Sequence, residues 1–183
     1  VGIISDEVVR MSQRLDQTMS EFADSLKTRW PLEDVLGLDI VAAAQRRIEQ
    51  QLGLSTKSEE IDEALWLRVE SFSLVFSICF LASRLIDNYQ IKELRFRLLP
   101  FGKLAYLDLI WAGHAMSTET SYTWETETMQ VGKEISPLSL RDVIDRHGGE
   151  IWYEREKAAQ RAFFRFVLPV AAPDELGAGE MID

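Results

Sequence analysis

The sequence predicts an α+β fold, in which a helical hairpin precedes a two-layer sandwich of helices on a β-sheet. Residues 139–169 read as an amphipathic helix that stops at two glycines and is followed by two short alternating strands. Residues 92–111 alternate apolar and polar side chains around a turn, which predicts a β-hairpin with one buried and one solvent-exposed face. Residues 5–52 carry apolar side chains at helical spacing.

The first two predicted helices form an antiparallel hairpin. One seam runs along residues 5–28, through Val8, Met11, Leu15, Met19, Phe22 and Leu26. A second stripe follows Pro31 and ends at Gly53, through Leu36, Ile40, Ala44, Ile48 and Leu52. Because two helices alone cannot bury both stripes, the sequence predicts a four-helix bundle between two chains, a homodimer through residues 5–53. Residues 1–54 are assigned to this dimerisation segment.

The second domain is predicted over residues 62–170, after a polar linker at residues 55–62. Residues 171–183 read as a polar tail or linker. Within the domain the patterns predict a strand at 64–70, a buried helix at 71–87, the hairpin that turns near Phe101-Gly102, a short helix at 120–129, a loop at 131–137, and the closing helix and strands.

Composition limits the function classes. With 46% hydrophobic and 27% charged residues, the 183-residue chain is an ordinary globular sequence. Its longest apolar run, residues 75–82, is shorter than the roughly 20 residues of a membrane span, so we expect no membrane contact by this segment and a cytoplasmic location. The net charge of -10 argues against nucleic-acid binding. A start at Val1 and a polar end suggest a piece of a longer protein, which leaves a membrane anchor elsewhere open.

The closing stretch also carries a resemblance. A helix ends in His147-Gly148-Gly149, and the last strand ends in Leu168-Pro169. This wording resembles the end of the ATP-binding (GHKL, or HATPase) domain of sensor histidine kinases. The resemblance implies a GHKL-type sandwich preceded by that family's dimerisation and phosphotransfer helices, and a place in bacterial two-component signalling.

The residues that carry kinase chemistry in that family are not matched. Asp6 stands where the resemblance places the phosphoacceptor histidine, and the only two histidines, His114 and His147, lie outside the hairpin. On the helix at 71–87, Phe80 and Arg84 align with two asparagines, the second of which holds magnesium. Phenylalanine cannot coordinate a hard cation, and arginine repels it.

Two further nucleotide-binding boxes are altered. The segment Trp111-Ala112-Gly113-His114-Ala115 aligns with Asp-x-Gly-x-Gly and lacks the carboxylate that accepts from adenine. Residues 135–139, Ile-Ser-Pro-Leu-Ser, replace a glycine-rich phosphate cradle. The resemblance therefore implies no catalytic residue, no bound cofactor and no metal, but a vestigial pocket near Arg84, Trp111, Gly113 and His114.

Several of these residues allow a second interpretation. His147 with its two glycines is either a helix stop or a catalytic base, and the stop is favoured. The tryptophans Trp111, Trp124 and Trp152 could stack on a ligand, although core filling is favoured. The single cysteine, Cys79, fits a buried helix position.

The wording of RWPLEDVLGLD and AYLDLIWAG is similar to degenerate kinase-like modules upstream of DNA polymerase III epsilon-like 3'-5' exonuclease domains in bacteria. The leading hypothesis is a non-catalytic pseudo-histidine-kinase module, a dimerising scaffold or signal-receiving part of a larger protein that contacts a protein partner or attached domain. The alternative is a divergent histidine kinase or ATPase that still binds ATP.

Overall fold

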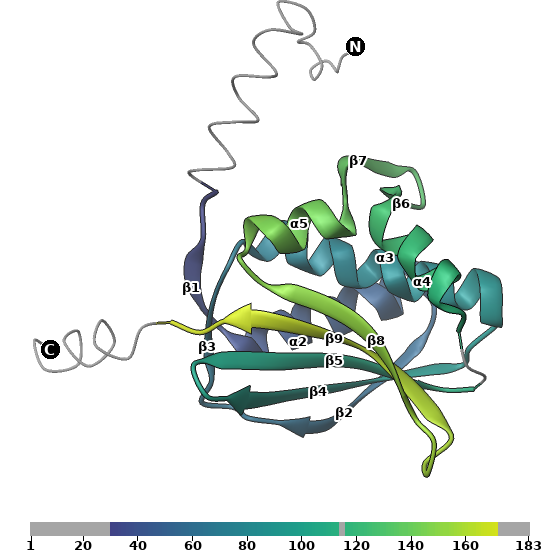
Figure 1. The fold of residues 1–183 in the computed structure, drawn as a ribbon, viewed down its shortest axis with the longest axis horizontal. Coiled ribbons are helices and arrows are strands. Elements are labelled where there is room, and N and C mark those ends of the chain that lie inside the picture. The colour runs from purple at the N-terminus through teal and green to yellow at the C-terminus, as the bar shows by residue number, and fades with distance from the viewer. Residues whose placement is uncertain (1–29, 114–115, 172–183) are drawn as a thin grey trace, which may run out of the picture. The chain divides into compact units, whose positions relative to one another are not determined.

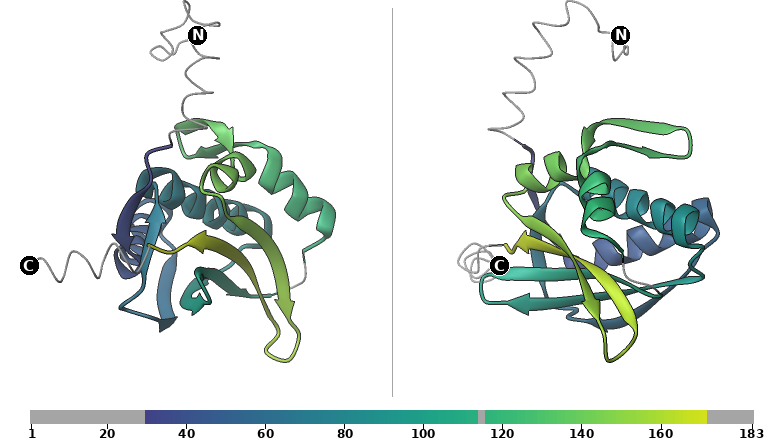
Figure 2. Two further views of the ribbon diagram at one scale, coloured as in Figure 1. Left: turned by 60° about the vertical axis from the view of Figure 1, so that its left-hand side comes forward. Right: turned by 45° about the vertical axis from the view of Figure 1, so that its right-hand side comes forward.

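The computed structural model describes residues 30–113 and 116–171, almost all of which belong to one compact unit that begins at Leu32. Its helices lie on one face of a five-stranded sheet (Figures 1 and 2), which confirms the predicted α+β class. In chain order the elements are β1 (Glu33–Leu36), α2 (Gly37–Arg47), η1 (Ile48–Leu52), β2 (Ser55–Ile61), β3 (Trp66–Val69), α3 (Ser71–Tyr89), β4 (Glu93–Phe101), β5 (Leu104–Ala112), α4 (Thr118–Thr126), β6 (Thr128–Val131), β7 (Glu134–Ser139), α5 (Leu140–Arg146), β8 (Glu150–Glu156) and β9 (Arg161–Pro169).

The sheet has the strand order β2-β4-β5-β9-β8, and every pair is antiparallel except β2–β4. The predicted hairpin at residues 92–111 is confirmed, because β4 and β5 pair around a turn at Gly102, which has a φ of 61°. Leu94, Phe96 and Leu98 are fully buried, and the arginines between them lie on the opposite face. Alternation in β4 therefore separates a helix-covered face from an outer face.

Helix α3 is the core helix of the domain, as predicted. It begins after Glu70, whose carboxylate accepts hydrogen bonds from the backbone N–H groups of Phe72 (3.1 Å) and Ser73 (2.9 Å). By length and composition alone it could cross a membrane. In this fold, however, its residues from Leu74 to Ala82 are all buried, and it packs against α2 and α5.

The prediction for residues 31–53 is wrong in two respects. A strand, β1, precedes the helix and pairs antiparallel with β3. The stripe of α2 and η1 is then buried within the same domain, where Ile40 is 2% exposed and Ala44 and Ile48 are fully buried. Because that stripe already has a partner, residues 37–52 cannot supply half of an intermolecular bundle. The other predicted helix, residues 5–28, lies outside the described residues.

The predicted linker at residues 55–62 is also wrong, because it is the edge strand β2. It runs parallel to β4, with Thr56 opposite Leu94 and a register shift between Ser58 and Glu60. An edge strand that is mostly exposed does not need the apolar alternation by which strands are recognised. The domain therefore begins near residue 32 rather than at 62.

Residues 131–137, predicted as a loop, lie largely in the β6–β7 hairpin. Met129 and Val131 on β6 are 1% and 3% exposed and join the main core. The hairpin thereby packs against α3. Helix α4 precedes it and ends at Thr126, earlier than predicted, because Thr128 already starts β6.

The closing helix and strands are confirmed. Ser139 and Asp142 form a reciprocal capping box at the start of α5. Gly148, with a φ of 68°, follows the helix end in the left-handed conformation, and β8 and β9 then pair antiparallel.

Candidate functional site

The residues that align with the kinase magnesium-binding helix lie on the side of α3 that faces α4 and β6. Phe80 is 2% exposed and belongs to the core. The guanidinium carbon of Arg84 lies 5.6 Å from the centre of the Phe80 ring, and the same guanidinium forms an ion pair with Glu127. Both positions are thus engaged by the domain's own side chains. The sequence did not single out Glu127 as the partner of Arg84, because the two are 43 residues apart and Glu127 is one of several nearby glutamates.

Two pockets flank Arg84, and we call them the Arg84 pockets. One, of about 460 Å3, lies against η1, α3 and β6 and includes Asp87. The other, of about 390 Å3, lies against α3 and α4 and includes Glu119 and Glu127. Among the described residues that line each pocket, Arg84 is the single cation; Asp87 balances it in the first pocket, and Glu119 and Glu127 outnumber it in the second. An anionic ligand would meet a negative local field in the second pocket.

Trp111 stands at the end of β5, where the resemblance expects an aspartate. It is 2% exposed, and its ring lies 5.7 Å from Phe164 and 6.1 Å from Tyr153. Trp124 from α4 joins the same group, 6.3 Å from Phe164. Trp111 and Trp124 therefore fill the core between sheet and helices, as the favoured interpretation predicted. Trp152 lies elsewhere, 6.3 Å from Tyr106.

The turn after β5 is held by the β8–β9 hairpin. The N–H of Gly113 donates to the carbonyl of Gln160 at 3.4 Å, and its carbonyl accepts from Arg155 Nη1 at 2.8 Å. The Met116 N–H donates to the Tyr153 hydroxyl at 2.8 Å. His114 lies outside the described residues. Arg84 and Trp111 line separate pockets, so the structure does not bring these two predicted pocket residues to one site.

The residues aligned with the phosphate cradle, 135–139, form β7 instead of a glycine-rich turn. Ile135 is 72% exposed near the hairpin tip, and Ser139 serves as the N-cap of α5. The segment is fixed by pairing with β6 and by the capping box. Its backbone N–H groups do not form an open cradle, since part of them is used in the hairpin.

His147 is a structural residue. It is 2% exposed; its Nδ1 lies 2.7 Å from the carbonyl of Val143, and its Nε2 accepts from the Glu70 N–H at 3.0 Å. The neutral Nδ1–H tautomer satisfies both contacts. Burial lowers the pKa of His147 below its usual value of 6.5. The favoured interpretation as part of a helix stop agrees with this geometry, because the ring ties the end of α5 to the start of α3.

This burial predicts a loss of stability in acid. Because the pKa of His147 is lower in the folded than in the unfolded chain, the unfolded chain binds more protons as the pH drops below about 6.5. The free energy of unfolding therefore falls in that range. Between pH 7.5 and 5.5 we expect the free energy of unfolding to fall by about 1 kcal/mol more in the wild type than in His147→Gln. Urea denaturation at both pH values measures this. Parallel losses in the two proteins would contradict it, because their carboxylates are identical.

Metal and thiol chemistry find little support in the described part of the chain. Within it no group of three or more His, Cys, Asp or Glu side chains is placed to hold a metal ion. Cys79 is buried on α3, and burial raises the pKa of its thiol to about 11. A thiol with that pKa is a poor nucleophile at neutral pH.

No protein-family model matches the chain, and no curated protein matches it in sequence. Solved structures match it in fold. The ATP-binding domain of PrrB from Mycobacterium tuberculosis superposes with a TM-score of 0.60 at 11% identity, over 78% of this chain and 99% of that one. For the nucleotide-free catalytic domain of histidine kinase ThkA the values are 0.59, 16%, 75% and 95%. For the Acinetobacter baumannii histidine kinase AdeS they are 0.57, 14%, 85% and 80%.

At these sequence identities the similarity establishes a shared fold but gives no evidence about activity. The match nonetheless covers nearly the whole of the PrrB and ThkA domains. The resemblance seen in the closing stretch is thus confirmed at the level of architecture: the chain has the α+β fold of histidine kinase catalytic domains.

Proposed function

We propose that this chain is a non-catalytic, histidine-kinase-like module that does not bind Mg-ATP and serves as a scaffold or signal-receiving part of a larger bacterial protein in the cytoplasm. The observation that carries the proposal is the Arg84–Glu127 ion pair over the Phe80 ring. It places a cation and an aromatic ring at the two positions where the resemblance expects asparagines. A magnesium ion would have to approach a guanidinium there.

Electrostatics supports the same conclusion. A triphosphate entering either Arg84 pocket would meet Asp87 on one side or Glu119 and Glu127 on the other. Freeing Arg84 for a phosphate would leave Glu127 without its ion-pair partner. In the pocket against α4 the two carboxylates outnumber Arg84, and like charges repel strongly where water is partly excluded, so this pocket disfavours the nucleotide.

Packing adds a third argument. Trp111, in place of the adenine-binding carboxylate, is in the aromatic core and accepts no hydrogen bond from an amino group. The adjacent turn is tied to the β8–β9 hairpin through Gly113. Trp111 and this turn occupy the place of the adenine-binding box with the domain's own contacts, which suits a domain whose role is to present surfaces.

The partner is a protein in this proposal. ThkA has been crystallised in complex with the response regulator TrrA, which illustrates protein docking by a kinase of this fold. For this chain we propose contact with a partner or an attached domain, an exonuclease domain among the candidates. The proposed homodimer rests on residues 5–28 alone, because the stripe of α2 is buried within its own domain.

Titration of the full 183-residue chain with Mg-ATP and a non-hydrolysable analogue tests the proposal. We expect no heat of binding and no rise in thermal midpoint up to millimolar nucleotide. A site with a Kd of about 10 μM would be stabilised by about 2.7 kcal/mol at 1 mM nucleotide, which is about 100 times that Kd, so binding of this strength would be detected. The ATP-binding domain of PrrB under the same conditions is the positive control.

The variant Glu127→Gln separates the causes. It removes the negative charge of Glu127 and its ion pair with Arg84. If this variant binds Mg-ATP, charge is the reason that the wild type does not bind it. A continued absence of binding would assign the lack of affinity to the filled core. Saturable stabilisation of the wild type by Mg-ATP would overturn the proposal in favour of the alternative, a divergent kinase or ATPase.

A further inference from the structure

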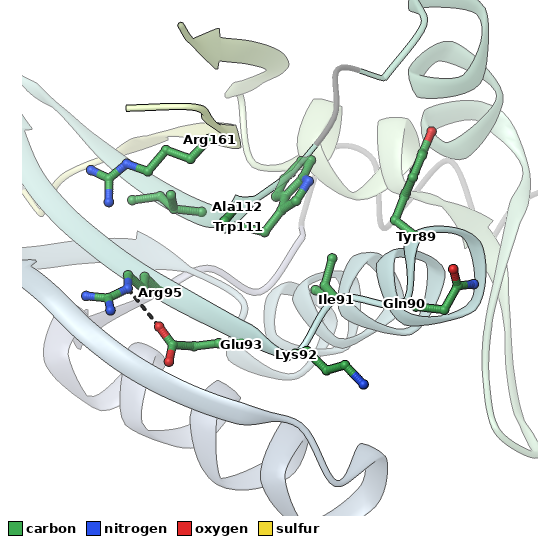
Figure 3. A pocket seen from close by; sticks show the side chains of 10 residues that line it. Tyr89, Gln90, Ile91, Lys92, Glu93, Arg95, Trp111, Ala112 and Arg161 are labelled. Atoms are coloured by element: carbon green, nitrogen blue, oxygen red, sulfur yellow. Dashed lines mark ion pairs between the residues drawn. The ribbon is translucent and has the colours of Figure 1, made fainter. Parts of the chain in front are cut away.

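A third pocket, of about 350 Å3, lies where α3 ends, β4 begins and β5 ends (Figure 3). Residues 89–93 and 110–112 line it, together with Arg95 and Arg161. None of these residues lines the Arg84 pockets. We call it the Arg95 pocket. It includes Trp111 and Ala112 from the segment that the resemblance aligns with the adenine-binding box.

The charge of the Arg95 pocket is opposite to that of the chain. Three cations, Lys92, Arg95 and Arg161, line it against one carboxylate, Glu93, although the whole chain carries a net charge of -10. Glu59 and Glu156, outside the lining, pair with Arg161, so the positive charge left to attract an anion is that of Lys92 and of Arg95, against Glu93.

Arg161 is held in place by carboxylates outside the pocket. Glu59 accepts from both terminal nitrogens of its guanidinium at 2.6 and 2.8 Å, and Glu156 accepts from Nε at 2.7 Å. These bonds raise the pKa of Arg161, which stays charged. It therefore forms a fixed wall of the pocket, and most of its donors are already used.

Arg95 has donors to spare. Its Nε lies 2.8 Å from Glu93 Oε2, while within the described residues Nη1 and Nη2 form no hydrogen bond or ion pair. Its side chain is 41% exposed, and in Figure 3 the Arg95 and Arg161 guanidiniums extend to the same side of the pocket. The terminal N–H groups of a guanidinium form a planar fork that matches the two oxygens of a carboxylate or phosphate.

The rest of the wall is apolar. Ile91, Ile110 and Trp111 supply the apolar part of the lining. Ile110 and Trp111 are 1% and 2% exposed and, as neighbours on β5, lie on opposite faces of the sheet, Ile110 on the face of Arg95 and Trp111 on the helix side. The volume falls within the range of about 300–1,000 Å3 typical of small-molecule sites, which combine an apolar lining with a few placed polar groups.

We propose that the Arg95 pocket binds a small organic anion, a carboxylate or phosphate monoester on a compact apolar body, with the anionic group at Arg95 and the body at the end of the pocket lined by Ile91 and Trp111. Lys92, which also lines the pocket, adds electrostatic attraction for the anion without a directed hydrogen bond. The Arg95 pocket shares no lining residue with the Arg84 pockets, so the inference does not depend on the Arg84–Glu127 ion pair that carries the proposed function.

Four probes separate the contributions: benzoate and phenyl phosphate carry both parts, benzyl alcohol carries the body alone, and inorganic phosphate carries the charge alone. Binding is followed by NMR shifts of the Trp indole N–H signals, with Trp111→Phe used to assign the relevant one. We expect benzoate or phenyl phosphate, or both, to shift the Trp111 signal saturably, and the stronger of the two identifies the anionic group. Benzyl alcohol and inorganic phosphate should bind roughly tenfold more weakly or worse.

The variants test the role of Arg95. Arg95→Gln should weaken the better probe by roughly tenfold. Arg68→Gln is the matched control and should leave affinity unchanged, because Arg68 is 44% exposed and also has one 2.8 Å ion pair, to Asp34. The proposal is overturned if neither anionic probe shifts the signal at tens of millimolar, if benzyl alcohol binds as well as benzoate, or if Arg95→Gln binds like the wild type.

Discussion

Replacing Asp108 by alanine should lower the free energy of unfolding by about 3–5 kcal/mol, the usual cost of removing one partner from a buried ion pair. Asp108 lies on β5, on the sheet face away from the helices, and is fully buried. Arg165 Nε donates to Oδ1 at 2.8 Å and its Nη2 to Oδ2 at 2.9 Å, while Arg97 Nε donates to Oδ2 at 2.8 Å. Both carboxylate oxygens are thus satisfied.

The cost is large because the two arginines cannot easily reach water. Their side chains are 12% (Arg97) and 19% (Arg165) exposed, and both guanidiniums lie over the Phe163 ring, at 5.1 and 4.9 Å from its centre. Arg97 keeps longer contacts to Glu59 and Glu156, but Arg165 would lose its carboxylate partner. A domain of ordinary stability, about 5–15 kcal/mol, would be left marginal.

Urea denaturation followed by circular dichroism measures this loss. The matched control is Glu93→Ala, which breaks the Arg95 pair whose side chains are 41% and 33% exposed, and should cost less than about 1 kcal/mol. If Asp108→Ala cost no more than the control, the desolvation of the charges would be offsetting nearly all of their attraction, and the network would not stabilise the sheet.

Gly149→Ala should destabilise the domain by about 3 kcal/mol, near the upper end of the range for overpacking. A Cβ atom at Gly149 would lie 2.1 Å from the carbonyl oxygen of Val167 and 3.3 Å from its carbonyl carbon. These are backbone atoms of the paired strand β9, so relief requires β8 and β9 to separate locally.

Its neighbour provides the comparison. Gly148 has a φ of 68° with open space around its Cβ position, so Gly148→Ala should cost only the conformational penalty of about 1–2 kcal/mol. Thermal and urea unfolding of both variants checks the order. A larger loss at Gly148 than at Gly149 would mean that helix termination, and not close backbone approach, explains the glycine pair.

Parts of the fold were predictable because their signals are local. The alternation in β4 indicates one face against the helices, and the long apolar stretch of α3 indicates burial on nearly all sides. The stop at Gly148 depends on one residue's backbone conformation. Each of these can be read within a short window of sequence.

Other parts were predicted wrongly because the deciding partner is distant in the chain. The stripe of α2 indicates that the helix has an apolar neighbour, but it cannot say whether this is another chain or, as in the structure, α3. Strand β2 is polar because it lies at an edge, and its pairing with β4 supplies the stability that its side chains do not.

The candidate site divides in the same way. The sequence by itself determined the chemistry of Phe80, Arg84 and Trp111, and the resemblance predicted that they replace the residue types a magnesium–nucleotide site needs. Only the tertiary structure decided what those side chains do instead. Arg84 forms an ion pair with Glu127, Trp111 packs against Phe164, and Arg95 keeps terminal nitrogens that no other described residue binds. The sequence does not show these contacts, because they depend on how the sheet and its helices bring distant segments together.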